Sequence, residues 1–140
     1  MNNYLKVKFP SKINNVQLSR ALLIGFLTDI DLPMSAINEL KTALSEAVTN
    51  AIVHGYNNDN SKEVELELNY NDHEIAMTII DYGIGIENIE AAKEPLFSTK
   101  LDEERAGLGF TIMEVFTDKL IIESQVNKGT KVVMIKQYAS

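Results

Sequence analysis

Three polar side chains recur four residues apart in the first half of the chain: Glu46, Asn50 and His54. On a helix of 3.6 residues per turn, this spacing advances by only about 40° per step, so the three lie along one stripe. A carboxylate there could act as a general base, and an asparagine carbonyl oxygen could bind a hard cation such as Mg²⁺. A solvated helix edge is the simpler interpretation of this trio alone. His54 could contact a site or merely close the helix near Gly55.

A second motif, Asp81-Tyr82-Gly83-Ile84-Gly85-Ile86, follows a strongly apolar segment. A carboxylate at a strand end can accept a hydrogen bond from a ligand amine, while the two glycines let the backbone come close to that ligand. A plain turn explains the motif equally well.

Two more glycine motifs lie further along the chain. Gly107-Leu108-Gly109 is predicted to open a helix, where free N–H groups and the helix dipole favour a phosphate. Gly129-Thr130 falls in a predicted hairpin, for which a simple β-turn is the plainer explanation.

Hydrophobic patterning predicts the elements that must position these motifs. Alternating residues predict strands at 5–9, 64–70, 74–81, 120–124 and 130–138, and helical spacing predicts helices at 15–30, 35–54 and 108–117. Because hairpins join several strands, we expect an α+β two-layer sandwich whose sheet is mixed but mostly antiparallel, with the helices on one face. The glycine-spaced stretch 83–109 is long for a loop, as functional lids are.

Composition excludes several classes of protein. The chain of 140 residues is expected to form a single domain, 1–140, and its net charge of −7 argues against nucleic-acid binding. It has no cysteine, no Gly-Lys-Ser/Thr triplet and no His-Glu-x-x-His motif, so thiolate chemistry, a Walker A loop and that zinc site are excluded. The longest apolar run is seven residues, 21–27, and no signal-peptide pattern is present, so we expect a cytoplasmic protein without a membrane partner.

The four motifs together resemble the nucleotide-binding boxes of the GHKL ATPase/kinase superfamily, in the superfamily's order and over nearly the whole chain. Within it, the chain is most similar to the anti-sigma factor serine kinases, in their sporulation branch, whose target is of the sigma F type. Three stretches carry this likeness: 45–56, 94–100 and 107–114.

This resemblance implies a role for each motif. Glu46 would be the catalytic base, Asn50 would ligate the Mg²⁺ that bridges the phosphates of ATP, and Asp81 would hold the adenine amino group with the help of Thr130. Other expected nucleotide-binding residues are Gly83, Gly85, Gly107, Leu108 and Gly109. Arg105 in the lid could reach the γ-phosphate or a docked partner, and Lys100 is a weaker candidate for a phosphate contact, but a solvent-facing loop charge explains both residues as well.

The resemblance also implies partners. The chain would bind a sigma factor in an ATP- or ADP-dependent way and phosphorylate a serine of an anti-anti-sigma factor. Arg20 and Arg105 are candidates for partner contacts, although an exposed helix charge is the simpler interpretation of Arg20. The lid is placed at about 93–108, and a homodimer is expected to pair through the first helix and first strand.

Three alternatives stay open. The chain could be a nucleotide-gated module that sequesters sigma without catalysis, a general-stress relative acting on another sigma factor, or a detached histidine-kinase catalytic domain. The presence of Glu46 argues against the first alternative, because a pure binding module needs no base.

Overall fold

The computed structural model describes residues 2–93 and 101–139, and for residues 101–106 it describes the backbone only. The elements in chain order are β1 (Asn3–Pro10), α1 (Asn15–Phe26), α2 (Met34–Asn50), the π-helical turn η1 (Ala51–Gly55), β2 (Glu63–Tyr70), β3 (Glu74–Asp81), α3 (Ile89–Ala92), α4 (Leu101–Phe116), β4 (Lys119–Gln125) and β5 (Gly129–Gln137). They form one sheet covered by helices, as the hydrophobic patterning predicts.

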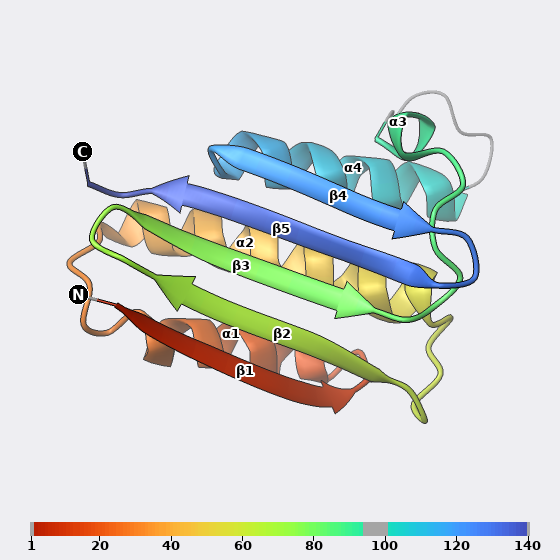
Figure 1. The fold of residues 1–140 in the computed structure, drawn as a ribbon, viewed down its shortest axis with the longest axis horizontal. Helices are drawn as coiled ribbons and strands as arrows, with labels where there is room; N and C mark the ends of the chain where they lie inside the picture. The colour runs from red at the N-terminus through yellow and green to blue at the C-terminus, as the bar shows by residue number, and fades with distance from the viewer. Residues whose placement is uncertain (1, 94–100, 140) are drawn as a thin grey trace.

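The five strands lie in the order β1-β2-β3-β5-β4, and all four pairings are antiparallel. The expectation of a mostly antiparallel sheet is confirmed, and none of the pairings among the described strands is parallel. Two helices separate β1 from β2, and Figure 1 shows that they run back and forth behind the sheet, so β2 enters from the end at which β1 left. An even number of helical crossings leaves these two strands antiparallel.

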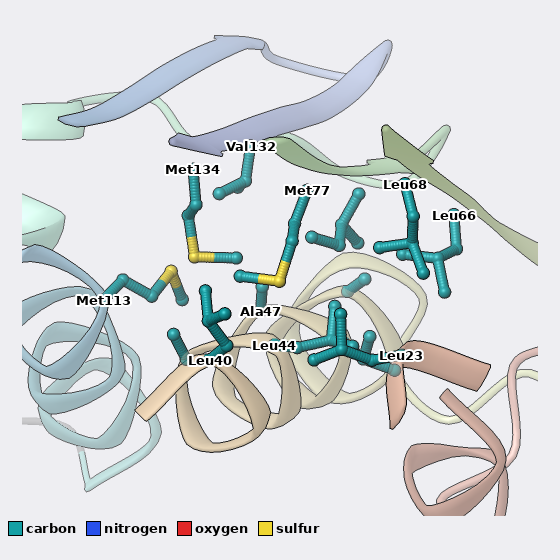
Figure 2. Packing of buried hydrophobic residues seen from close by; sticks show 14 of the residues in the cluster. Leu23, Leu40, Leu44, Ala47, Leu66, Leu68, Met77, Met113, Val132 and Met134 are labelled. Atoms are coloured by element: carbon teal, nitrogen blue, oxygen red, sulfur yellow. The ribbon is translucent and has the colours of Figure 1, made fainter. Parts of the chain in front are cut away.

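The helices α1, α2 and α4 cover one face of the sheet (Figure 1), which confirms the predicted two-layer arrangement. The core lies between the layers, and Figure 2 shows side chains of β3 and β5 pointing toward those of α2 and α4. The fully buried side chains at this interface include Leu40, Leu44, Val48, Met77, Met113 and Met134. The positions 40, 44 and 48 repeat every four residues, so α2 presents one continuous apolar stripe to the sheet.

Two helix boundaries differ from the prediction. The first helix ends at Phe26 rather than at residue 30. The last helix begins at Leu101 rather than at residue 108, and the Thr111 hydroxyl donates to the Gly107 carbonyl oxygen inside it. The charged stretch 101–106 consists mostly of good helix formers but lacks the apolar periodicity on which the prediction relied. Over the described ranges, no helix is long and apolar enough to cross a membrane.

Candidate nucleotide site

A cavity of about 430 Å³ opens where α2 and η1, the ends of β3 and β5, the segment after β3 and α4 meet. Its volume falls in the range of small-molecule sites. Its apolar wall includes Ala47, Ala51, Ile79, Ile86, Phe110 and Val132. Its polar lining includes Asn50, His54, Asp81, Glu87, Asn88 and Thr130. Residues from four of the predicted motifs, or their immediate neighbours, therefore meet at one site.

Asp81 is the buried acid of this cavity, with 5% of its surface exposed. One of its oxygens, Oδ1, accepts a hydrogen bond of 3.0 Å from the Gly83 N–H, as the Asp-x-Gly spacing permits. Burial raises the pKa of Asp81 to about 6, against the lowering effect of backbone hydrogen bonds from Gly83 and Thr130. The carboxylate is thus held in place from two sides while its remaining lone pairs stay available to a ligand donor.

The glycines around Asp81 allow close approaches between backbone segments. A Cβ on Gly83 would lie 1.9 Å from the Gly55 carbonyl oxygen, and one on Gly85 would lie 2.1 Å from that of Gln125. Gly85 also has a φ of 73°, in the left-handed region that glycine adopts most readily. These two glycines fix the path of the segment that borders the cavity, and the structure gives them this packing role.

Glu46 and Asn50 lie side by side against α4. A Cβ on Gly109 would lie 3.1 Å from Glu46 Oε2 and 3.2 Å from Asn50 Nδ2, so the glycine leaves room for both side chains. Burial raises the pKa of Glu46 above its ordinary value. A carboxylate with a raised pKa is a better proton acceptor than an exposed one, as a general base requires. Glu46 and Asn50 therefore place a proton acceptor and an amide group next to each other beside the cavity.

The helix that carries Asn50 ends differently from the simple α-helix that was predicted. Residues Ala51–Gly55 form a π-helical turn, closed by a 3.0 Å bond from the Tyr56 N–H to the Ala51 carbonyl oxygen. This wider turn places Gly55 against Asp81, where an added Cβ would lie 2.6 Å from the carboxyl group. His54 lines the cavity within the same turn, which favours the first of the two interpretations left open for it.

The glycines of the third motif are placed differently from the prediction. Gly107 and Gly109 lie inside α4, so the expectation that they open a helix was wrong, whereas the nucleotide-binding roles expected of Gly107, Leu108 and Gly109 stay predictions. Backbone N–H groups inside a helix bond to carbonyl oxygens of the preceding turn and are not free for an anion. Gly109 serves the site through its missing side chain, and Leu108 points outward with 52% of its surface exposed.

Of the three remaining predicted residues, one lies away from the cavity and the other two have side chains that the structure does not describe. Arg20 is half-buried on α1 and is not among the residues that line the cavity. Arg105 belongs to the part of α4 whose side chains are not described, and Lys100 lies outside the described residues. Their predicted roles stay predictions.

Sequence reasoning missed three residues that shape the site. Gly55 was interpreted only as a helix stop, Tyr56 received no role, and Ser124 was interpreted only as part of a strand. The Tyr56 hydroxyl donates to the Glu63 carbonyl oxygen at 2.7 Å and accepts from the Tyr82 N–H at 2.7 Å. Ser124 is a polar residue in register with the inward-facing Leu120 and Ile122, a signal that could have been noticed.

A magnesium ion would find part of its coordination here. The Nδ2 atom of Asn50 is buried without a hydrogen-bond partner among the described residues, so its N–H can donate to a phosphate oxygen, while the amide oxygen is the atom that would hold the metal ion. Over the same residues, no three acidic or histidine side chains gather as a self-sufficient metal site. Mg²⁺ commonly binds through one or two protein oxygens, with phosphate and water oxygens completing its shell. The donor set therefore fits an ion that arrives with a phosphate ligand.

Comparisons with known proteins show which family and which relatives this chain is similar to. Residues 9–136 match the family model described as "Histidine kinase-like ATPase domain". The chain is 45% identical over 137 residues to the "Anti-sigma F factor" of Clostridium perfringens strain SM101, covering 98% of each chain. It is also 45% identical over 139 residues to the "Anti-sigma F factor" of Geobacillus kaustophilus, covering 99% of this chain and 95% of the relative.

Among solved structures, the fold is similar to a crystal structure of the RsbU and RsbW domains of Rv1364c from Mycobacterium tuberculosis, with a TM-score of 0.69 and 21% identity. The likeness covers 96% of this chain but only 32% of that longer one, so this chain spans about a third of it. At this level of identity the comparison supports the fold alone.

Proposed function

Because the chain belongs to the histidine kinase-like ATPase domain family, we propose that its cavity binds ATP or ADP with Mg²⁺ and that the protein is a serine kinase that inhibits a sigma factor. In this proposal residues 1–140 form a single ATP-binding domain. ATP is the ligand that membership of an ATPase family implies. The names of its relatives in Clostridium and Geobacillus support the anti-sigma role.

The orientation of the nucleotide follows from the two groups of polar residues. The buried Asp81 carboxylate is an acceptor in a cavity whose wall includes the apolar Ile79 and Val132, which suits the amino group and the ring of adenine. Asn50 lies about one and a half helical turns from Gly55, which contacts Asp81, so the phosphates would extend toward Asn50 and Glu46. Bound Mg²⁺ would neutralise phosphate charge, and Asn50 would hold it there.

One observation carries the kinase part of the proposal: Glu46, a carboxylate with a raised pKa, lies beside Asn50, which lines the cavity. We assign Glu46 to accept the proton of a serine hydroxyl as that oxygen attacks the γ-phosphorus. The bond to the leaving ADP oxygen breaks as the new bond forms. Phosphoryl transfer depends mainly on positioning and charge stabilisation, which this arrangement supplies.

The partners belong to the same proposal. A sigma factor of the sporulation type would be bound and inhibited, and an anti-anti-sigma factor would supply the serine. We place partner contacts at Arg20 on α1 and at Arg105, and a homodimer contact at α1 and β1. The stretch at about 93–108 would be the lid whose nucleotide state favours one partner over the other. The expected location is the cytoplasm.

The test uses γ-labelled ATP, Mg²⁺, the purified chain and a candidate antagonist protein. We expect label on an antagonist serine, and Glu46→Gln should reduce the transfer rate by roughly 10²- to 10⁴-fold, the usual contribution of a general base. Calorimetry should show that Glu46→Gln still binds ATP, because this change removes a charge and preserves the shape of the side chain.

Three other outcomes of this experiment would each contradict a part of the proposal. ATP binding without transfer to any antagonist would contradict the kinase and favour a nucleotide-gated binding module. Transfer to a histidine of a separate protein would favour a detached histidine-kinase domain. A chain that binds no adenine nucleotide would overturn the whole proposal.

A further inference from the structure

A single hydroxyl joins the two polypeptide segments that border one side of the cavity. Ser124 lies near the end of β4, and its Oγ is 2.7 Å from the Ile86 N, 3.0 Å from the Gly129 carbonyl oxygen and 2.8 Å from Thr130 Oγ1. Ile86 and Thr130 line the cavity, whereas Ser124 is not among the lining residues. Ser124 therefore supports the site from behind.

The direction of each hydrogen bond follows from the number of protons. A serine hydroxyl has one proton and two acceptor lone pairs. The Ile86 N–H can only donate, and the Gly129 carbonyl can only accept, so they take one lone pair and the proton of Ser124. In the arrangement that satisfies all three contacts at once, Thr130 donates its proton to the second lone pair. The proton of the Thr130 hydroxyl is then engaged and only its lone pairs are left, so toward the cavity this hydroxyl can act solely as an acceptor.

The same hydroxyl helps to hold the segment after β3. Two backbone hydrogen bonds hold Ile84: its N–H donates to the Gly55 carbonyl oxygen at 3.0 Å, and its carbonyl oxygen accepts from the Asn127 N–H at 2.7 Å. The bond from Ser124 fixes Ile86, two residues further on. This part of the cavity wall is thus bound to β4 through Ser124 and to the β4–β5 turn through Asn127.

We propose that Ser124 is a positioning residue that sets the specificity of the site by keeping Thr130 an acceptor. The inference rests on the proposed nucleotide binding. With Asp81 and Thr130 both presenting oxygen lone pairs, the cavity favours a ring that carries an amino group over one that carries an oxygen there. A base with a 6-amino group is accepted, and a 6-oxo base is disfavoured.

The experiment compares ATP with inosine triphosphate, which has an oxygen in place of the 6-amino group. Dissociation constants are measured by calorimetry for the wild type, Ser124→Ala, Thr130→Val and the double variant. We expect Ser124→Ala to reduce the preference for ATP by roughly three- to tenfold, the effect of one hydrogen bond, because the Thr130 proton becomes free to donate to a 6-oxo group. The double variant should match Thr130→Val, because without the threonine hydroxyl nothing is left for Ser124 to orient.

Two further variants separate positioning from folding. Ser124→Thr retains the hydroxyl and should retain the preference, and Ser124→Cys keeps the size but bonds weakly and should lose it, even if Ser124→Ala does not fold. Ser61→Ala is a matched control, because the Ser61 hydroxyl hydrogen-bonds with Asp59 on an exposed loop and Ser61 is not among the residues that line the cavity. An unchanged preference in Ser124→Cys, or additive effects in the double variant, would overturn the inference. A wild type that binds neither nucleotide would instead overturn the proposed function.

Discussion

The two polar ends of the cavity are completed to different degrees. At one end the Asp81 carboxylate already accepts hydrogen bonds from the backbone of Gly83 and Thr130. At the other end the Asn50 Nδ2 is buried without a partner among the described residues, and the neighbouring Glu46 has a raised pKa. The first end is assembled by the fold itself, whereas the second is left for a ligand to complete. The end that would recognise the adenine ring is therefore preorganised. Asn50 and Glu46 at the other end would be fully engaged only when the phosphates and the metal ion bind.

The largest expected effect comes from filling the tight approach at the first end. In Gly83→Ala the new Cβ would lie 1.9 Å from the Gly55 carbonyl oxygen, so one backbone segment must move. We expect a loss of about 3 kcal/mol in the free energy of unfolding, at the upper end of overpacking effects, together with loss of nucleotide binding. Urea denaturation measures the first and calorimetry the second.

Gly25→Ala on α1 is the matched control, because nothing lies within 4 Å of its added Cβ. In a helix interior that change should stabilise the protein by about 1 kcal/mol. Equal effects at both glycines would show that the closeness of Gly55 and Gly83 does not shape the site.

The next effect concerns the charge of Asp81. The ionised carboxylate is the form that accepts a hydrogen bond from an amine, so ATP affinity should fall as the pH decreases through about 6. Asp81→Asn should weaken ATP binding by roughly 10- to 100-fold, the value of a charged hydrogen bond, and should remove this pH dependence. Calorimetric titrations between pH 5 and about 8 would measure both.

The stability of the free protein should change in the opposite direction. The pKa of Asp81 rises from 3.8 to about 6 on folding, so between these values the native state holds a proton that the unfolded chain has lost. The contribution of Asp81 to the free energy of unfolding therefore decreases as the pH rises through this window, and it is lowest above the window. Asp81→Asn should lack this decrease and be more stable than the wild type at neutral pH. A less stable variant at neutral pH would show that the ionised carboxylate contributes to folding.

Tyr56 tests how far the first end depends on a residue outside the cavity. Tyr56→Phe leaves the partly buried Glu63 carbonyl and Tyr82 N–H without the partner that the hydroxyl supplies. Two lost hydrogen bonds should lower the free energy of unfolding by about 2 kcal/mol. The ATP affinity should fall as well, since Tyr82 follows Asp81 directly. A fall in stability with unchanged affinity would restrict Tyr56 to a structural role.

These residues also show where prediction from sequence succeeds and where it fails. The strands and α2 follow from local alternation and helical spacing, and the cavity gathers Asn50, Asp81 and Thr130 because their motifs end or adjoin these elements. The start of α4 was missed because helix propensity, rather than an apolar stripe, forms its charged first turns. The bond between Tyr56 and Tyr82 spans 26 residues, and no local pattern encodes such a contact. The antiparallel pairing of β1 and β2 likewise depends on the path of two intervening helices.

The smallest expected effect lies at the second end and concerns position rather than stability. In Gly109→Ala the added Cβ would lie 3.1 Å from Glu46 Oε2 and 3.2 Å from Asn50 Nδ2, so both side chains must yield slightly. A helix favours alanine over glycine by about 1 kcal/mol, which should offset most of this crowding and leave the melting temperature nearly unchanged. Phosphate transfer should nevertheless fall about tenfold, because small displacements of reacting groups cost rate. Val115→Ala, which alters an exposed side chain elsewhere on α4, is the control. Equal transfer rates in the two variants would mean that the space beside Gly109 is not needed for the chemistry, and the contrast between the two ends would then rest on Asn50 alone.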